Sequence, residues 1–413
     1  MTDRSHAERL DAEDPLAAFR ERFAIHDPET IYLDGNSLGR LPLATRGRLT
    51  ELTDAWGSAL VRGWHDWIDL PERLGDLLAD AVLGARPGEV IVTDSTTVNL
   101  FKLAAAVLDT RTGAIVTDSE NFPTDRYVLD GLSRGHGREL RVFDTDPLNG
   151  PQAEDVKRAC QAGDVAFVSL SHVAYRSGAL ADMEQIAAAA APAPVIWDLS
   201  HSAGAVPVEL EQRGVALAVG CTYKYLNAGP GAPAFLYVRT ELQERLRTPI
   251  QGWFGQRHQF VMERPYDPAS GVRRFLAGTP SILALAGVEE GAKLIAEAGA
   301  GNLRDKAAAL SELIVAIHDE RLAQLGFRLG SPRDPARRGA HVSLAHDDAW
   351  AICRALIERA KVVPDFRTPD SIRLGVPPLY TRFTDVYDAL DRLATLVERG
   401  DHREVDSGPL RVT

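Results

Sequence analysis

Cysteines and long apolar runs are scarce in this chain of 413 residues. Its three cysteines, Cys160, Cys221 and Cys353, are widely separated and odd in number, which argues against a disulfide framework or a zinc site. No apolar run approaches the length of about 18 residues that a membrane-spanning helix needs, and the N-terminus has no apolar leader segment. We therefore expect a reduced, soluble, cytoplasmic protein that binds no metal.

Concentrated positive charge is also missing. The chain has 46 Lys and Arg against 58 Asp and Glu, a net charge of −12, and no stripe of basic residues. Affinity for nucleic acids comes from clustered cations, so neither a nucleic acid nor a membrane is an expected partner. The composition, 45% hydrophobic and 25% charged, is that of a globular protein, and the length allows two or three domains.

Short apolar segments alternate with helical patterns between about residues 89 and 240. Continuous apolar strands separated by helices are typical of a mainly parallel sheet that is covered on both faces. Ligands of such sheets collect at the C-terminal ends of the strands. The predicted strands are Glu89–Asp94, Ala114–Asp118, Leu140–Phe143, Val165–Ser171, Val195–Leu199, Ala216–Cys221 and Phe235–Val238.

The pattern changes in the last third of the chain. Residues 281–326 predict a long helix broken near Gly299, and shorter strands and helices follow it. We expect an N-terminal segment, 1–50, that packs with the small domain or with a partner subunit, a large domain at 51–295, and a small α+β domain at 296–413. The charged tail after Gly400 is expected to be mobile. The predicted late elements are strands His341–Ala345 and Ser371–Val376 and helices Asp347–Ala360 and Thr384–Arg399.

Asp198 and Lys224 follow two of the predicted strands. Asp198 ends the apolar run that begins at Pro194, and Lys224 lies just past the run Val215–Val219. A lysine amine can hold an aldehyde as a Schiff base, and a carboxylate can keep a pyridine nitrogen protonated. The pair therefore predicts pyridoxal 5′-phosphate (PLP) as the cofactor, bound at the ligand end of the sheet.

Seven motifs follow one another between about residues 30 and 385. They are Tyr32–Gly39, Asn121–Asp125, Trp197–Gly204, Cys221–Asn227 followed by Gly229–Ala232, Gly252–Gly255, Gly278–Pro280 and Ile372–Tyr380. In this order they resemble kynureninase, a family of PLP enzymes with the aspartate-aminotransferase-like fold. The resemblance implies an α/β fold: a PLP-dependent transferase-like large domain with a mainly parallel sheet, plus a smaller α+β C-terminal domain.

The resemblance also implies an activity. Kynureninases hydrolyse the Cβ–Cγ bond of L-kynurenine, or of a 3-hydroxy or methyl derivative, to the matching anthranilate and L-alanine, as in tryptophan catabolism. The family works as a homodimer with active sites shared between subunits. The sequence leaves open which kynurenine is preferred, and whether the pathway is catabolic or makes an antibiotic.

Roles for individual cofactor contacts follow from the resemblance. Lys224 would form the Schiff base and act as the base at Cα, Asp198 would pair with the ring nitrogen, and Tyr223 would contact the phosphate and donate a proton. Thr96 and Thr97 begin a predicted helix, whose free amides suit a phosphate. Asp198 as a mere helix cap is the competing interpretation. The other expected contacts are Phe122 stacked on the ring, Asp125, His201, and Trp253 and Thr279 from the second subunit.

Arg373 is the expected partner of the substrate α-carboxylate, because a planar guanidinium can contact both oxygens. Arg367, six residues upstream, is its competitor and is expected to have a role in loop structure. Asn36 is a second predicted substrate contact. Trp64 falls where the family builds its aryl pocket, with His65 and Trp67 as close competitors.

Two other functions compete with this one. A cysteine desulfurase of the same fold would need a mobile nucleophilic cysteine, and Cys353 lies inside a predicted helix. A non-catalytic interaction protein with the same fold would be expected to have lost Lys224 or Asp198, and both are present.

Overall fold

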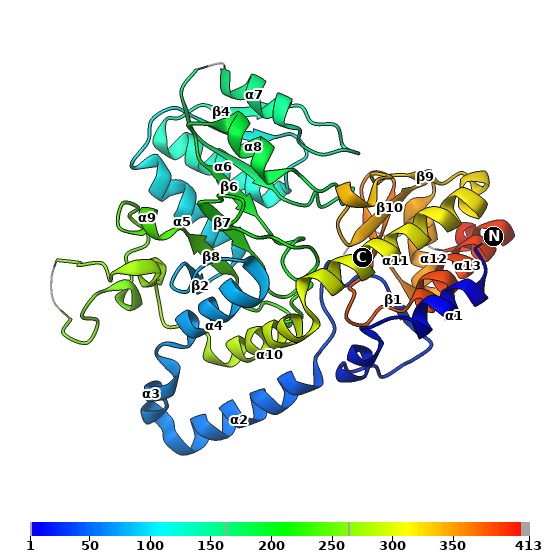
Figure 1. Ribbon diagram of the computed structural model, residues 1–413, viewed down its shortest axis with the longest axis horizontal. Coiled ribbons are helices and arrows are strands. Elements are labelled where there is room, and N and C mark those ends of the chain that lie inside the picture. The colour runs from blue at the N-terminus through cyan, green and yellow to red at the C-terminus, as the bar shows by residue number, and fades with distance from the viewer. Residues whose placement is uncertain (1, 162, 263–264, 406–413) are drawn as a thin grey trace.

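The computed structural model describes residues 2–161, 163–262 and 265–405 (Figure 1). A seven-stranded sheet forms the centre of the larger part, a four-stranded sheet lies in the smaller part, and β1 pairs with β11 in a two-stranded sheet. Within the described residues no helix is both long enough and apolar enough to span a membrane. The expected mobile tail falls mostly on residues 406–413, which lie outside the described residues.

The large sheet has the strand order β2-β8-β7-β6-β5-β3-β4. All neighbours from β4 to β7 run parallel, and β8 runs antiparallel to both β7 and β2. The prediction of a mainly parallel sheet is therefore confirmed. Its strands are β2 Val90–Val92, β3 Ala114–Asp118, β4 Leu140–Phe143, β5 Val165–Ser171, β6 Val195–Asp198, β7 Leu217–Gly220 and β8 Phe235–Val238.

Helices cover both faces of this sheet (Figure 1). In β6, Ile196 belongs to the apolar cluster beneath α5 and α6, whereas Trp197 belongs to the cluster beneath α4, α8 and α10. Because side chains alternate along a strand, Asp198 points to the face of α5. The helices of this part are α2 Leu43–Ala59, α3 Trp64–Trp67, α4 Leu70–Leu78, α5 Thr96–Leu108, α6 Pro123–His136, α7 Ala153–Gln161, α8 Met183–Ala190, α9 Thr240–Gln243 and α10 Ile282–Ala298.

The smaller part is an antiparallel sheet, β12-β13-β10-β9, packed against helices. The predicted long helix is indeed broken at Gly299, whose φ of 78° interrupts it between α10 and α11. The elements here are β1 Ile31–Tyr32, β9 Arg328–Leu329, β10 His341–Ala345, β11 Val362–Val363, β12 Asp365–Arg367, β13 Ser371–Gly375, α1 Arg4–Ala12, α11 Ala300–Ile317, α12 Ala349–Arg359 and α13 Phe383–Arg399.

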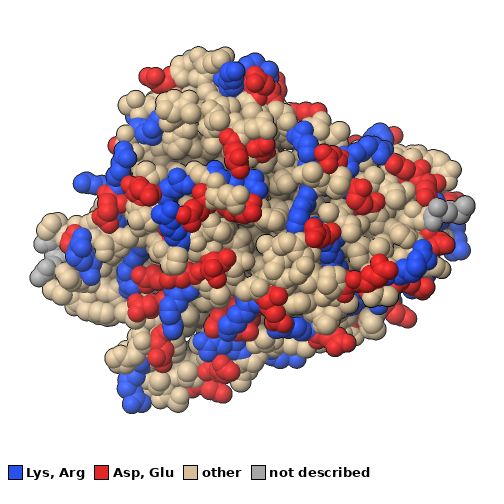
Figure 2. Space-filling model, viewed as in Figure 1, with Lys and Arg blue, Asp and Glu red and all other residues tan. Residues whose placement is uncertain are grey.

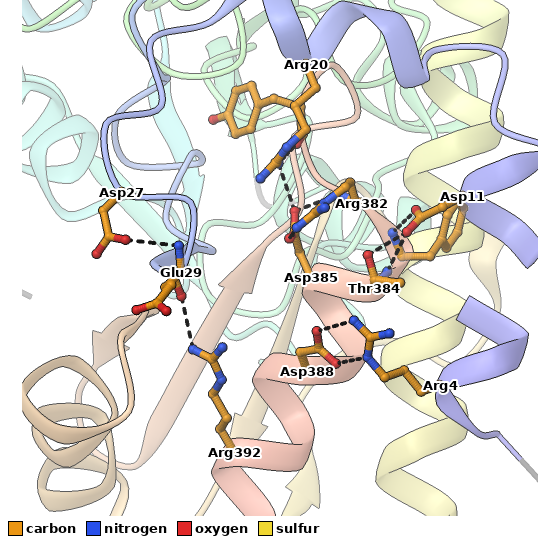
Figure 3. A network of polar contacts seen from close by, with 12 residues as sticks. Arg4, Asp11, Arg20, Asp27, Glu29, Arg382, Thr384, Asp385, Asp388 and Arg392 are labelled. Carbon is orange, nitrogen blue, oxygen red and sulfur yellow. Dashed lines mark hydrogen bonds and ion pairs between the residues drawn. The ribbon is translucent and has the colours of Figure 1, made fainter. Parts of the chain in front are cut away.

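The N-terminal segment lies against the last helix of the small part. Arg4 forms an ion pair with Asp388, and Arg20 forms one with Asp385 (Figure 3). Asp11 accepts hydrogen bonds from the first turn of α13. Beyond these contacts, β1 pairs in parallel with β11. The segment therefore contacts the small part within one chain, while the domain boundaries stay a prediction.

Candidate active site

A cavity of about 140 Å³ opens where the strands of the large sheet end. It brings together the strand tips that the sequence singled out and the first turn of α5. Of the predicted cofactor contacts, eight line it and Thr279 and Trp253 do not. The lining residues are Ser95, Thr96, Thr97, Phe122, Thr124, Asp125, Ser171, Asp198, Ser200, His201, Tyr223, Lys224, Gly231, Ala232 and Ala234.

Lys224 points into this cavity from the turn after β7. Its Nζ atom lies 3.4 Å from Nε2 of His201. The same ammonium is 5.8 Å from the centre of the Phe122 ring and 5.9 Å from that of Tyr223. Burial lowers the pKa of His201 well below its usual value, and the charge of Lys224 lowers it further. His201 is therefore a neutral acceptor for the lysine.

Asp198 is buried at the tip of β6 and is oriented by a serine. Its Oδ1 accepts hydrogen bonds from the backbone N–H of Ser200 at 2.8 Å and from the Ser200 hydroxyl at 2.6 Å. Burial raises the pKa of Asp198, while Lys224 acts in the opposite direction. Asp198 thus does cap a local turn, but it also faces the cavity, where a protonated ring nitrogen would offset its burial.

Asp125 adds a second buried carboxyl group to the same cavity. Its Oδ2 has no hydrogen-bond partner among the described residues. Burial raises the pKa of Asp125 well above its usual value, and the charge of Asp198 adds to this effect. Buried acceptors without partners are rare in folded proteins. The unpartnered Oδ2 of Asp125 is therefore typical of a site that receives a donor from a ligand.

The first turn of α5 forms the opposite end of the cavity. Ser95 is the N-cap, because its hydroxyl accepts from the backbone N–H of Val98. Thr96 and Thr97 are the first helical residues, with backbone amides of the kind that binds phosphate. Burial raises the pKa of Tyr223, so this phenol stays protonated at neutral pH. A lysine, two carboxyl groups and a helix start in one cavity fit the aldehyde, ring nitrogen and phosphate of PLP.

Arg373 lies outside this cavity, in a fully buried position on β13. Its Nη1 donates to the carbonyl of Tyr175 at 2.6 Å and its Nη2 to the hydroxyl of Ser37 at 2.9 Å. Asp365 forms an ion pair with Nη2. With its amide oxygen facing the guanidinium, Asn36 accepts from Nε at 2.6 Å. The sequence-predicted pair Asn36 and Arg373 is therefore in contact. We call these five residues the Arg373 corner.

Arg367 does not have the loop role that the sequence suggested. It lies on the strand β12, and its Nη2 is 3.0 Å from Oδ2 of Asp365. Arg367 and Arg373 therefore share one carboxylate, because β12 pairs with β13 and places Asp365 opposite Arg373. The expectation of a loop residue was wrong because strands as short as β12 give little signal in sequence.

Three of the predicted aryl-pocket and partner-subunit residues, Trp64, His65 and Trp253, line a second, apolar cavity of about 460 Å³. The Trp64 ring is tilted against that of Phe254, with the ring centres 5.8 Å apart, and the exposed Trp253 packs edge-on against Phe254. Trp67 lies instead beneath Gly63, where a Cβ atom would be 2.4 Å from its ring. Thr279 is exposed on the segment before α10. The lining residues are Val61, Trp64, His65, Ile68, Trp253, Phe254 and Phe260.

Several residues that shape the site were not predicted as site residues. Ser200 orients Asp198, and Ser37, Tyr175 and Asp365 hold Arg373. Ser200 and Ser37 stand inside motifs quoted above, so their positions carried a signal. Tyr175 acts through its backbone carbonyl, which no residue pattern reveals.

The thiol required by the desulfurase alternative is poorly placed. Cys353 is fully buried within α12, against the core of the small part. Burial raises the pKa of Cys353 to about 12. A thiol that is neither ionised nor accessible is a poor nucleophile.

Comparison with known proteins follows this geometry. The chain is 44% identical to a kynureninase from Pseudomonas fluorescens, over 97% of this chain and 96% of that protein. It is 41% identical to a kynureninase from Burkholderia pseudomallei strain K96243, over 96% of each. The family model of the kynureninase C-terminal domain matches residues 303–393.

Solved structures extend the comparison to the fold. A cysteine desulfurase from Thermococcus onnurineus NA1 superposes with a TM-score of 0.77 at 18% identity, over 95% of this chain and 98% of that one. A mutant of C-DES with glycine covalently linked to its PLP cofactor gives the same TM-score at 20% identity, over 89% and 97%. These structures have the PLP-dependent fold, and the alignments with the two curated relatives cover nearly the whole chain. The chain therefore belongs to the kynureninase family.

Proposed function

We propose that this chain cleaves L-kynurenine, or a ring-substituted kynurenine, by means of Lys224, Asp198 and Tyr223. As a kynureninase it is a PLP-dependent hydrolase that breaks the Cβ–Cγ bond to give an anthranilate and L-alanine. One observation supports the assignment of the residues most directly: Lys224 and Asp198 line the same small cavity. The three cysteines are unpaired, which supports a reducing, cytoplasmic location.

Lys224 has two roles in the proposed reaction. Its amine would hold the aldehyde of the cofactor, and once released it would take the proton from Cα of the substrate. The bound cofactor supplies an electron-withdrawing ring that stabilises the negative charge left at Cα. His201, neutral and 3.4 Å from Nζ, can accept a hydrogen bond from the lysine and so orient it.

Asp198 and Tyr223 control charge and protons at opposite ends of the site. Asp198 would keep the proton on the ring nitrogen of the cofactor, and the two hydrogen bonds from Ser200 fix the direction of its carboxyl group. Water adds to the γ-carbonyl of the substrate, and the bond to Cβ then breaks. Tyr223 keeps its proton because burial raises its pKa, so it can give that proton to the alanine fragment.

Arg373 and Asn36 form the proposed substrate-binding end. The guanidinium is held rigidly by Tyr175, Ser37 and Asp365, so the charge that attracts the α-carboxylate is fixed in place. A fixed carboxylate decides which bond at Cα lies perpendicular to the cofactor ring. This end therefore determines which bond at Cα is broken as well as how tightly the substrate binds.

A homodimer with shared sites is part of the proposal. The apolar cavity around Trp64 and Trp253 opens on a surface with large exposed side chains, and such surfaces are typical of protein contacts. A second copy covering it would bring Trp253 and Thr279 toward the neighbouring site and enclose an aryl pocket at Trp64. The exposed side chains are Leu43, Leu49, Trp56, Leu60, Val61, Trp253, Phe260, Val261 and Met262.

The ring preference is tested by measuring kcat/KM for kynurenine, 3-hydroxykynurenine and a methylated analogue. Trp64→Ala, His65→Ala and Trp67→Ala should be compared on the same panel. Trp64 and His65 line the apolar cavity and Trp67 packs under Gly63, so changed ring preference is expected from the first two only. Wild-type protein that cleaves none of the three kynurenines would overturn the proposed activity.

Subunit exchange tests the shared site. Mixed Trp253→Ala and Lys224→Ala proteins should regain activity, because each heterodimer then has one site with neither defect and one with both. Neither parent protein should show the activity of the mixture. An active monomer in gel filtration would contradict the shared site.

A further inference from the structure

The guanidinium of Arg373 has few donors left for a substrate. Of its five N–H groups, Nε donates to Asn36, one group on Nη1 donates to Tyr175, and those on Nη2 face Ser37 and Asp365. Among the described residues, one N–H group on Nη1 is left without an acceptor. A carboxylate has two oxygens, so a ligand bound at this corner needs a further donor.

His341 is placed to supply it. The residue lies on β10, which pairs antiparallel with β13 so that Ser343 is opposite Arg373 and His341 is opposite Gly375. Residues 341 and 343 share one face of the sheet, which makes His341 a diagonal neighbour of Arg373 on that face. On its other side, the His341 ring lies 5.5 Å from the ring of His201, which contacts Lys224.

The imidazole of His341 is fully buried and lacks partners. Neither Nδ1 nor Nε2 makes a hydrogen bond within the described part of the chain. Burial lowers its pKa most, Arg373, Lys224 and Arg367 lower it further, and the backbone of Ala174, which lies outside hydrogen-bond geometry, acts in the other direction. The ring is therefore neutral and carries one N–H. A buried polar group without a partner calls for an explanation, and a ligand that provides the partner is one.

We propose that His341 donates a hydrogen bond to the substrate α-carboxylate, beside Arg373. This inference rests on the proposed function and adds a residue to its substrate-binding end. His341 holds one carboxylate oxygen and the free N–H of Arg373 holds the other, between the small part and Lys224. The contact spans the two parts of the molecule, because the carboxylate is bound by β10 and β13 while the amine end reaches Lys224 on the large sheet.

Equilibrium binding of L-alanine, the carboxylate-bearing product, tests this proposal. Its decarboxylated counterpart, ethylamine, serves as the second ligand, and cofactor absorbance reports both titrations. His341→Leu should raise the Kd of L-alanine about 10- to 150-fold, the loss expected for one hydrogen bond to a charged group. The Kd of ethylamine should change less than about twofold, since no charged hydrogen bond is lost. The KM for kynurenine should rise together with the Kd of L-alanine.

Amide variants keep the test independent of folding. Asn places its N–H near the position of Nδ1 and Gln near that of Nε2, so one of His341→Asn and His341→Gln should bind alanine more tightly than His341→Leu. His172→Leu is the matched control. His172 is also buried with an unpartnered Nδ1, but it lines a separate cavity that shares no residue with the cofactor cavity. The His172→Leu variant should bind L-alanine with the Kd of the wild type.

Two results would overturn the role of His341. One is an unchanged Kd for alanine in the leucine and both amide variants, and the other is an equal weakening of alanine and ethylamine. A wild-type protein that binds alanine but does not cleave kynurenine would instead overturn the proposed function, and the alanine titrations would still decide the role of His341.

Discussion

The cofactor cavity and the Arg373 corner belong to one proposed active site but are built in different ways. The cavity gathers strand tips of a single sheet with the first turn of α5, all within residues 95–234. The corner joins segments that lie far apart in the chain, from Asn36 to Arg373. One is a product of sheet topology, and the other depends on the small part closing over the N-terminal segment.

Charge is handled differently in the two regions. The cavity leaves the carboxyl groups of Asp125 and Asp198 buried beside a single lysine, and burial raises the pKa of both. In the corner, Asp365 pairs with Arg373 and with Arg367. The cavity therefore depends on a ligand to balance its charges, whereas in the corner two guanidinium groups share one carboxylate, which holds Arg373 rigidly and leaves net positive charge. Removal of the cofactor should therefore destabilise the cavity far more than the Arg373 corner.

Loss of Lys224 should have the largest effect on the cavity. Lys224→Ala should abolish turnover and the visible absorbance of the lysine-bound cofactor, because deleting a covalent step raises the barrier by more than about 4 kcal/mol. The fold should survive, since Lys224 is not part of the apolar core. Lys293→Ala, a lysine paired with glutamates on the surface of α10, is the control and should remain active. Retained absorbance in Lys224→Ala would contradict the assignment.

Asp198→Asn should separate binding from activation. A neutral amide cannot hold the proton on the ring nitrogen, so kcat should fall by about 100-fold, or about 2.7 kcal/mol, with a much smaller change in cofactor affinity. Asp118→Asn is the matched control. Asp118 is buried at the tip of β3, two strands away from β6 in the same sheet, but does not line the cavity. A kcat within about twofold of wild type would show that Asp198 is not the ring partner.

Arg373→Lys should weaken substrate binding with little effect on the cofactor. An ammonium cannot reproduce the guanidinium geometry, and one charged hydrogen bond is worth about 1.5–3 kcal/mol, so KM should rise about 10- to 150-fold. Arg367→Lys is the comparison, because it touches the same Asp365 from the other side. Its effect should be milder. The reverse order of severity would assign the carboxylate to Arg367 and break the proposed corner.

Asp34 should make the smallest difference to catalysis, because its expected effect is on stability. Burial, followed by the charge of Asp365, raises the pKa of Asp34 to about 7. Between about pH 4 and 7 the folded chain keeps a proton at Asp34 that the unfolded chain has released, so the free energy of unfolding falls as the pH rises. Over that range the free energy of unfolding of Asp34→Asn should fall by about 3 kcal/mol less than that of the wild type, because each unit of pKa shift is worth about 1.4 kcal/mol. Denaturant titrations at several pH values measure it, and identical slopes for the two proteins would contradict it.

The sequence predicted the cofactor cavity better than the corner. Strands β3, β4, β5, β8 and β10 have the predicted bounds, because continuous apolar runs between turns are strong local signals. Lys224 and Asp198 were predicted from their positions after two apolar strands, and the motif order then indicated the family and their roles. The helices α2, α4 and α7 and the short strands β9, β11 and β12 were not predicted, because their patterns are brief or weakly periodic.

Tertiary contacts account for what the sequence could not show. The N–H groups of Arg373 are occupied by the backbone carbonyl of Tyr175 and by the carboxylate of Asp365 on the neighbouring β12. The two ring nitrogens of His341 have no hydrogen-bond partner among the described residues, which only the folded structure can show. Neither property belongs to a residue type or a spacing, so both required the folded chain.

The parallel pairing of β1 with β11 has a consequence for biosynthesis. Ile31 is paired with Val362, so the strand made among the first residues has no partner until the ribosome has added more than 300 others. At typical rates of synthesis this interval is on the order of 20 to 60 s. During that time Asn36 and Ser37 have no Arg373 to hold, although the strands around Lys224 are already complete. A newly made chain should therefore be able to capture its cofactor before it can recognise its substrate.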